Sequence, residues 1–199
     1  MHNTHIRRKG SEMTGPARNK TRDISKTAVL TQSGLLIAIM AVCSWISIPL
    51  PGTGVPINLA TFAVILTGLL LGSRKGASAT AVFLLLGAVG IPVFAGFTGG
   101  LGILAGPTGG YLIGYVFLAA FAGLASPIGH VRSTKRYIFA VIAGEAVLYL
   151  LGTLWFIHLT GTGFTAAMAA CVIPFIPGDV AKMILAWILA CRLAKFLRT

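Results

Sequence analysis

The last long apolar segment of the chain opens with the sequence Ile173-Pro174-Phe175-Ile176-Pro177-Gly178-Asp179-Val180-Ala181-Lys182. Pro177 favours the first turn of a helix, where the helix dipole stabilises a carboxylate such as Asp179. Side chains three residues apart share one helix face, so we expect Asp179 and Lys182 to contact each other. An ionisable side chain in a membrane segment costs about 2.5–3.5 kcal/mol even on lenient insertion scales. The pair is therefore the first candidate for a functional site.

The composition predicts an integral membrane protein. Hydrophobic residues make up 56% of the 199 residues and charged residues only 10%, with a mean hydropathy of +0.88. A soluble domain needs more charge on its surface than this. The net charge of +12 would suggest nucleic acid as a partner of a soluble chain. Apart from Lys182, however, the basic residues lie in the tail or at the ends of the apolar segments, so we expect a lipid bilayer as the partner and no nucleic acid.

The apolar segments predict an all-α membrane domain over residues 27–199, preceded by a basic, disordered cytoplasmic tail over residues 1–26. Gly, Pro and charged residues divide this domain into six predicted transmembrane helices, near 29–48, 57–72, 77–91, 109–126, 136–159 and 177–197. The second and third are short for a bilayer, which suggests that they end at a cavity rather than at water.

The positions of the basic residues predict the topology. Beyond the tail they lie in three places: Arg74 and Lys75; Arg132, Lys135 and Arg136; and Arg192, Lys195 and Arg198. These places are every second connection and the C-terminus, as expected for six spans with both termini cytoplasmic in a prokaryotic-type cell membrane. Lys182 is the one basic residue that does not fit the alternation, and Glu145 and Asp179 are the only acidic residues outside the tail. Because the sixth helix begins outside, we expect the site to open outward.

The connection from Ile91 to Tyr111 is too rich in Gly and Pro for a helix and too apolar for a solvated loop. Irregular backbone of this kind is tolerated at membrane depth where protein or a cavity satisfies it. We therefore expect a lid over an apolar ligand, and a plug without ligand contact is the alternative. Its glycines lack the strand–turn–helix context of a dinucleotide site, and the chain has no Walker A motif, so we expect no nucleotide hydrolysis.

Several motifs together resemble the biotin-specific substrate-binding component, BioY, of energy-coupling factor (ECF) transporters, from about Ala28 to Leu197. They are Leu71-Gly72-x-Arg74-x-Gly76, Gly90-Ile91-Pro92-Val93-Phe94-Ala95-Gly96, Gly99-Gly100, Gly106-Pro107-Thr108-Gly109-Gly110-Tyr111 and Pro177-Gly178-Asp179-x-x-Lys182. The resemblance implies a six-helix subunit for high-affinity biotin capture and uptake, with a Gly-rich lid between helices three and four. It also implies a transmembrane coupling (T) subunit and two ATPase subunits as partners. This chain would bind no cofactor, and ATP would be used only by the partners. Ala60 departs from the family pattern, in which a glutamine commonly stands there.

Biotin has a flat ureido group, an apolar ring and chain, and a carboxylate. Asp179 is suited to accept from the ureido N–H groups, and Lys182 to donate to the ureido oxygen or the carboxylate. The alternative is an ion pair that only fixes the last helix. The full set of predicted biotin-binding residues is Asp179, Lys182, Val93, Phe94, Phe97, Gly99, Gly100, Thr108, Tyr111, Asn58 and Tyr149. For the aromatic residues ordinary packing is the alternative, and Asn58 is equally suited to cap its helix.

Two further features leave alternatives open. We expect Glu145 to lie deeper than Asp179 by more than the length of biotin, either as the floor of the pocket or as a protonated, hydrogen-bonded structural carboxyl. Gly34 and Ala38 form a small-residue face on the first helix. In the family such residues dock the coupling subunit, and close packing inside this chain is the alternative.

Other functions remain to be weighed against biotin capture. One is capture of another vitamin by the same architecture. The other is an intramembrane enzyme using Asp179 or Glu145. An enzyme would be expected to bring a nucleophile and base, or metal ligands, close together, and the four histidines are scattered along the chain. We therefore expect a chain that is not an enzyme, with no catalytic and no metal-binding residues.

Overall fold

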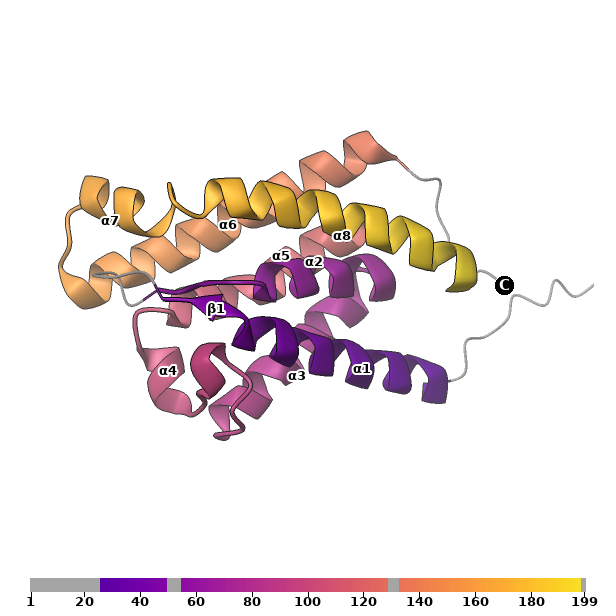
Figure 1. Ribbon diagram of the computed structural model, residues 1–199, viewed down its shortest axis with the longest axis horizontal. Coiled ribbons are helices and arrows are strands. Elements are labelled where there is room, and N and C mark those ends of the chain that lie inside the picture. Colours follow the sequence, from indigo (N-terminus) through magenta and orange to yellow (C-terminus); the bar gives the residue numbers. More distant parts are fainter. Residues whose placement is uncertain (1–25, 50–54, 129–132, 198–199) are drawn as a thin grey trace, which may run out of the picture.

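The computed structural model of the chain describes residues 26–49, 55–128 and 133–197 as a bundle of helices (Figure 1). The elements are α1 (Lys26–Trp45), β1 (Ser47–Ile48), β2 (Ile57–Asn58), α2 (Ala60–Leu71), α3 (Ser73–Ala88), the 3-10 helix η1 (Ala95–Phe97), α4 (Leu101–Ala105), α5 (Gly109–Leu124), α6 (Thr134–Thr160), α7 (Phe164–Cys171) and α8 (Ile176–Leu197). The predicted tail lies outside the described residues except for Lys26, where α1 begins. Arg132 and Arg198 lie outside them too.

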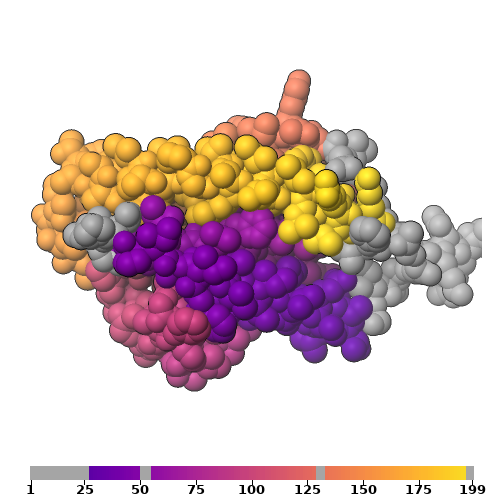
Figure 2. Space-filling view, in the orientation of Figure 1, coloured from indigo at the N-terminus to yellow at the C-terminus, as the bar shows by residue number. Residues whose placement is uncertain are grey.

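Helices α2 and α5 form the centre of the bundle. Helix α5 packs against α6, α2 and α3, and α2 also packs against α8 and α1. The approach of α2 to α5 is close because Gly68 has no side chain: a Cβ there would lie 2.3 Å from the Ala119 carbonyl oxygen. Figure 2 shows α8 and α1 on one face of the molecule with part of α2 visible between them.

Each of the six predicted segments contains a helix, but their boundaries and connections differ from the prediction. Helix α2 begins at Ala60, because Ile57 and Asn58 form a short antiparallel pairing with β1. Only Gly72, at a φ of 80°, separates α2 from α3. Arg74 and Lys75 therefore lie in the first turn of α3 and not in a loop between helices.

Two further differences concern the connections that were predicted to face outward. The prediction that the connection from Ile91 to Tyr111 contains no helix is wrong, because η1 and the five-residue α4 form within it. Gly96 and Gly100, at φ values of 68° and 102°, make the turns that these short helices require. Between α6 and α8 the chain also forms α7, which bends by 47° into α8.

Two tryptophans fix this connection to the bundle. The indole N–H of Trp45, at the end of α1, donates to the Pro92 carbonyl oxygen at 2.8 Å. The indole N–H of Trp155, in α6, donates to the Gly106 carbonyl oxygen at 2.9 Å. The segment from Pro92 to Gly106 is thus held at both ends against opposite sides of the bundle, and we call it the lid segment.

The length and composition of the helices fit a membrane protein. Residues Thr27–Trp45 of α1 and all of α6 are long and apolar enough to cross a bilayer, and α7 with α8 makes a third such segment if the bent pair is one span. Helices α2 and α5 are apolar but shorter. Large apolar side chains face outward on several helices, including Leu30, Phe139 and Ile184. The count of six spans stays a prediction.

The two ends of the bundle differ. Helix α1 begins and α8 ends at one end, whereas the β-strands, the lid segment and α7 gather at the other (Figure 1). We call the second the lid end. Helix α2 has only 12 residues, about 18 Å of helix, and begins well inside the lid end. Its first turn is therefore available to line an internal cavity.

Candidate functional site

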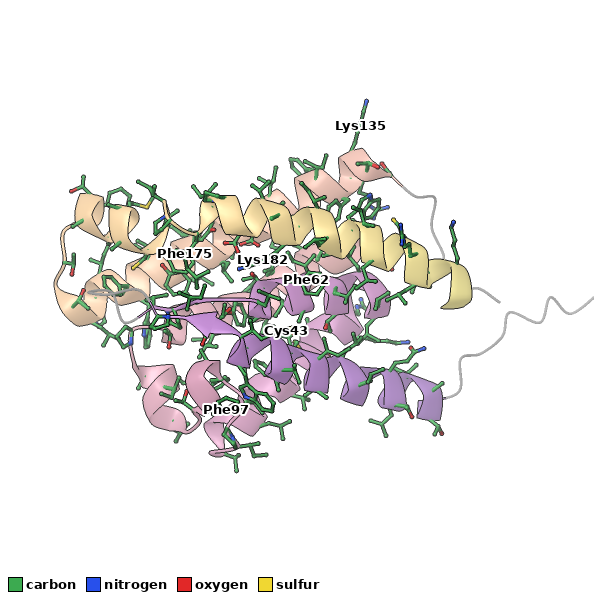
Figure 3. The ribbon with its side chains drawn as sticks, viewed as in Figure 1. Cys43, Phe62, Phe97, Lys135, Phe175 and Lys182 are labelled. Carbon is green, nitrogen blue, oxygen red and sulfur yellow. The ribbon has the colours of Figure 1, made fainter. Side chains whose placement is uncertain are left out.

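A buried ion pair lies at the start of α8. Lys182 Nζ stands 2.8 Å from Asp179 Oδ1, as the three-residue spacing predicts. The two residues are only 8% and 5% exposed. Asp179 lies in the first turn of α8, where the helix dipole stabilises its charge. Figure 3 shows Lys182 directed from α8 into the bundle, in contrast to Lys135, which points away from it.

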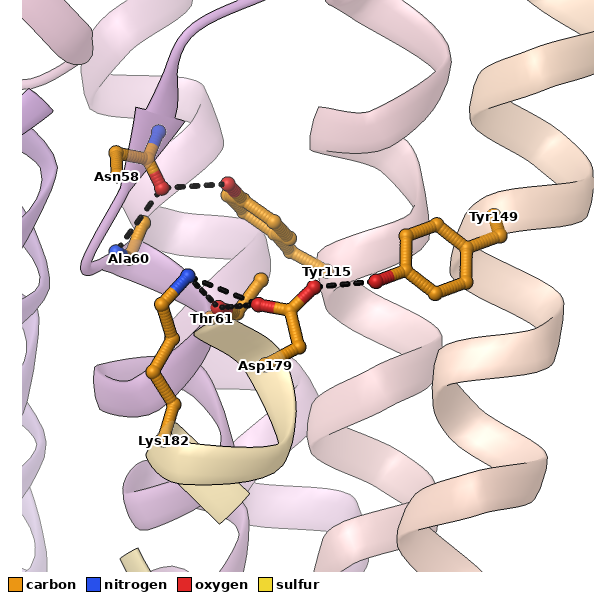
Figure 4. Close-up of polar contacts among 7 residues, drawn as sticks. All are labelled: Asn58, Ala60, Thr61, Tyr115, Tyr149, Asp179 and Lys182. Carbon is orange, nitrogen blue, oxygen red and sulfur yellow. Dashed lines mark hydrogen bonds and ion pairs between the residues drawn. The ribbon is translucent and has the colours of Figure 1, made fainter. Parts of the chain in front are cut away.

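Two hydroxyl groups from other helices complete the surroundings of this pair (Figure 4). Thr61 Oγ1, in the first turn of α2, donates to Asp179 Oδ1 at 3.2 Å and accepts from Lys182 Nζ at 3.1 Å. The Tyr149 hydroxyl, from α6, donates to Asp179 Oδ2. Both carboxylate oxygens of Asp179 are therefore bonded, and α2, α6 and α8 meet at this one side chain.

A cavity of about 250 Å³ opens beside the ion pair at the lid end. Its lining residues come from every major element except α3 and α7: Ser44, Val55, Pro56, Asn58, Thr61, Phe94, Ala95, Thr98, Ile103, Thr108, Tyr111, Leu112, Tyr115, Leu148, Tyr149, Phe175, Asp179 and Lys182. We call it the ligand cavity. Its wall is mostly apolar and aromatic with a few polar groups on one side, the usual composition of a small-molecule site.

Asn58 and Tyr115 form a second polar group on this wall. The Tyr115 hydroxyl donates to Asn58 Oδ1 at 3.4 Å, and the Ala60 backbone N–H donates to the same oxygen at 3.1 Å. Asn58 thus accepts a backbone hydrogen bond at the start of α2 and also lines the cavity, where its contact with a ligand stays a prediction. Because its oxygen is occupied by these donors, its side-chain N–H groups are the part suited to meet a ligand.

Seven of the predicted binding residues line the ligand cavity: Asp179, Lys182, Asn58, Tyr149, Phe94, Tyr111 and Thr108. Phe94 fits because Gly87 of α3 has no side chain, since a Cβ there would lie 2.0 Å from the Phe94 ring. Tyr111 packs in the same way over Gly152 of α6.

Four predicted residues do not line the cavity. Val93 is buried in the core, and Phe97 is 64% exposed with its ring stacked on Trp45 at 4.7 Å between centroids. Gly99 packs against the backbone of Ile91, and Gly100 provides a turn with positive φ. All four shape the lid segment, so the sequence placed them in the right region but not on the right surface.

Thr61 and Tyr115 line the cavity but are not among the binding residues predicted from the sequence. A threonine and a tyrosine within apolar helices are common, so nothing in the local pattern distinguishes them. Only the position of Thr61, at the start of an unusually short helix, could have indicated from the sequence that it belongs to the site. Ala60, which departs from the family pattern, is fully buried and does not line the cavity.

The predicted depth of Glu145 is wrong. Glu145 lies in α6 one turn, or roughly 6 Å along the helix axis, from Tyr149, and the Tyr149 hydroxyl bonds Asp179. This separation is less than the length of biotin. Neither carboxylate oxygen of Glu145 has a hydrogen-bond partner among the described residues, so these residues supply none of the hydrogen bonds expected of a structural carboxyl.

Gly34 and Ala38 lie on the outer surface of α1, both exposed. A Cβ built at Gly34 would meet nothing within 4 Å. The alternative for the small-residue face was close packing inside this chain. This alternative therefore does not apply to Gly34.

The apolar helices and the partly polar cavity together are those of a membrane protein with a small-molecule site. More specifically, the chain belongs to the BioY family, whose family model matches residues 13–199.

Relatives and a solved structure agree with this assignment. The chain is 37% identical over 169 residues to a biotin transporter BioY of Thermotoga maritima, covering 83% of this chain and 95% of the relative. It is 36% identical over 176 residues to a biotin transporter BioY of Rhizobium etli, covering 85% and 91%. Its fold is similar to that of a crystallised S-component for biotin from an ECF-type ABC transporter, with a TM-score of 0.79 and 27% identity, covering 87% and 94%.

The shared hydroxyl of Thr61 gives a prediction about stability. Replacing Thr61 by valine keeps the shape of the side chain but leaves Asp179 and Lys182 each without one buried hydrogen bond. We expect Thr61→Val to lower the free energy of unfolding by about 1–3 kcal/mol, measured by denaturation in detergent.

Thr67→Val is the matched control on the same helix, because the Thr67 hydroxyl is fully buried but bonds only to the Ala63 carbonyl of its own helix. We expect it to cost less than about 1 kcal/mol, because that carbonyl keeps its helical hydrogen bond. Equal losses in the two variants would show that Thr61 has no special role beside the ion pair.

Proposed function

We propose that the chain captures biotin from outside the cell for uptake, as the substrate-binding subunit of an ECF-type transporter. The observation that supports this most directly is the buried Asp179–Lys182 pair on the wall of an apolar cavity. Membership of the BioY family, and relatives named as biotin transporters, support the identity of the ligand. They also argue against another vitamin and against an enzyme.

The donors and acceptors at the ion pair suit a ureido group or a carboxylate. An ammonium group has three N–H donors, and Lys182 uses one toward Asp179 and one toward Thr61. The third is available to donate to an oxygen of biotin. Asp179 Oδ1 and Oδ2 have further lone pairs, which suit the ureido N–H groups. Charge-assisted hydrogen bonds of this kind are strongest away from water.

The remaining wall suits the apolar part of biotin. Phe94 and Phe175 provide aromatic faces, and Ile103 and Leu112 provide aliphatic ones. Phe94 and Ile103 belong to the lid segment, so binding would be coupled to the position of this segment. With its ends fixed by Trp45 and Trp155, the segment would close over the ligand by adjusting between these anchors.

The basic residues support the proposed orientation of the chain in the membrane. A second cavity, at the end of the bundle away from the lid, is lined by Arg74, Lys75 and Arg136 together with residues near the start of α1. These side chains therefore lie at one end, where the described chain also begins and ends. We assign this end to the cytoplasm and the lid end to the outside, with six spans and both termini cytoplasmic.

The outer face of α1 is the proposed docking surface for the coupling subunit. Gly34 and Ala38 are exposed there, and small residues allow another helix to approach closely within a bilayer. The energy for transport would come from two ATPase subunits on the cytoplasmic side. No cofactor is assigned to this chain.

The first test is binding by the isolated chain. We expect the purified subunit to bind labelled biotin saturably and to hydrolyse no ATP, because it has no phosphate-binding loop. Excess unlabelled biotin should displace the label, whereas thiamine or riboflavin should not. The absence of saturable biotin binding by a folded protein would contradict the proposal.

The second test is topology. We expect single cysteines at Arg74 and Arg136 to react only with reagents that reach the cytoplasm, and cysteines at Phe97 and Leu101 to react from outside. All four positions are exposed, while the native cysteines Cys43, Cys171 and Cys191 are buried and give a low background. Labelling of Arg136→Cys from outside intact cells would disprove the orientation and the count of six spans.

A further inference from the structure

A third cavity lies in the crevice between α6 and α8, behind the ligand cavity. Its volume is about 260 Å³, and its walls are apolar apart from Glu145, Tyr149 and Asp179. Large side chains bridge the two helices below it: the Tyr137 hydroxyl donates to the Met183 carbonyl oxygen at 2.5 Å, and its ring stacks on Trp187. We call this space the α6–α8 crevice.

Glu145 is the unexplained group in the crevice. It is 6% exposed, and both carboxylate oxygens are buried without a hydrogen-bond partner among the described residues. Lys182 is no counter-ion for it, since the described ion pair of Lys182 is with Asp179. Buried polar groups are nearly always bonded, so an unbonded carboxylate facing a cavity calls for a ligand of its own.

The charges around Glu145 indicate that this ligand is a proton. The titratable groups that face it are Tyr137 and Tyr149 on its own helix, Tyr115 on α5, and Asp179 and Lys182 on α8. The tyrosines are uncharged at neutral pH, and Asp179 and Lys182 cancel each other. An ionised Glu145 would therefore be an uncompensated negative charge in an apolar site. Such a group takes up a proton rather than stay ionised.

The crevice and the ligand cavity share one wall. Tyr149 and Asp179 line both cavities, and the hydrogen bond between them joins α6 to α8 at this wall. Glu145 lies one turn from Tyr149 on the same face of α6. A single layer of side chains therefore separates the Glu145 carboxylate from the ligand cavity. Little water lies between them to screen a change in the charge of this carboxylate.

We propose that Glu145 is a proton-binding site coupled to the ligand cavity, and that the protonated form is the one that binds anionic biotin tightly. This inference rests on the proposed function. Ionisation of Glu145 would place a negative charge beside Asp179, one layer of side chains from a cavity that holds an anionic ligand, which weakens binding. By linkage, biotin binding must then favour the protonated form and draw a proton from solution. The proton forms an ordinary O–H bond to the carboxylate and returns to solvent on release.

The test is the pH dependence of biotin affinity in the wild type and in Glu145→Gln, from about pH 5 to pH 9, where buried carboxyls titrate. Glutamine has the shape of a protonated glutamate but cannot ionise. We expect wild-type affinity to fall by roughly tenfold or more as the pH rises through the titration of Glu145. The affinity of the glutamine variant should stay at its low-pH value. All other titratable groups are the same in both proteins, so a difference between the two pH profiles reports on Glu145.

A second measurement needs no variant. Calorimetry in two buffers of different ionisation enthalpy measures the protons taken up on binding, and we expect net uptake by the wild type at a pH where Glu145 is partly ionised. The methyl ester of biotin, which is uncharged, should show a weaker pH dependence than biotin. Identical pH profiles for wild type and Glu145→Gln, or no proton uptake at any pH, would overturn the inference. Failure of the wild type to bind biotin at any pH would instead contradict the proposed function.

Discussion

The structure depends on one constraint, which is that a charged pair is kept inside an apolar bundle. Burying two ions costs several kcal/mol each unless their geometry and remaining hydrogen bonds compensate for the lost water. Here Asp179 and Lys182 are 2.8 Å apart, and hydroxyls from α2 and α6 bond the same carboxylate. Thr61 can reach the pair only because α2 is short and begins inside the bundle. The break between α7 and α8 likewise places Asp179 in a first helical turn. A pair that serves stability alone would be a costly choice, because apolar residues of similar size are often as stable.

The lid segment complements the ion pair on the opposite side of the ligand cavity. It presents Phe94, Ala95, Thr98 and Ile103 to the cavity, and its glycines provide turns rather than ligand contacts. Indole hydrogen bonds from Trp45 and Trp155 fix its ends to α1 and α6. The ion pair and Tyr149 thus stand on the long helices α8 and α6, and the apolar cover stands on a segment with short helices. This arrangement suits a protein that must hold its ligand firmly and still open to release it.

The sequence allowed prediction of those features that depend on local physics. The spacing of Asp179 and Lys182 predicted their contact, and apolar segments predicted the helices within a few residues. Features that depend on distant parts of the chain could not be predicted in this way. Thr61 is 118 residues from Asp179, and nothing near it in the sequence marks it as a partner. Phe97 was expected in the cavity because it is aromatic and close to Phe94, but its ring is exposed and stacks on Trp45. The predicted depth of Glu145 failed because α7, which was not predicted, occupies the lid end before α8 begins, so Asp179 lies further inside the bundle than expected.

The most direct test of the central claim, that the ion pair binds biotin, compares Asp179→Asn, Lys182→Met and the double variant. Lys135→Met serves as the exposed control. We expect each single change to leave one buried charge unpaired and destabilise the protein by about 3–5 kcal/mol, and the double change to restore stability. Biotin affinity should not return with it, because the hydrogen bonds to the ligand, worth about 1.5–3 kcal/mol each, are still missing. The measurements are melting temperature in detergent and biotin affinity. Full biotin affinity in a well-folded double variant would contradict the claim and leave the pair a purely structural role.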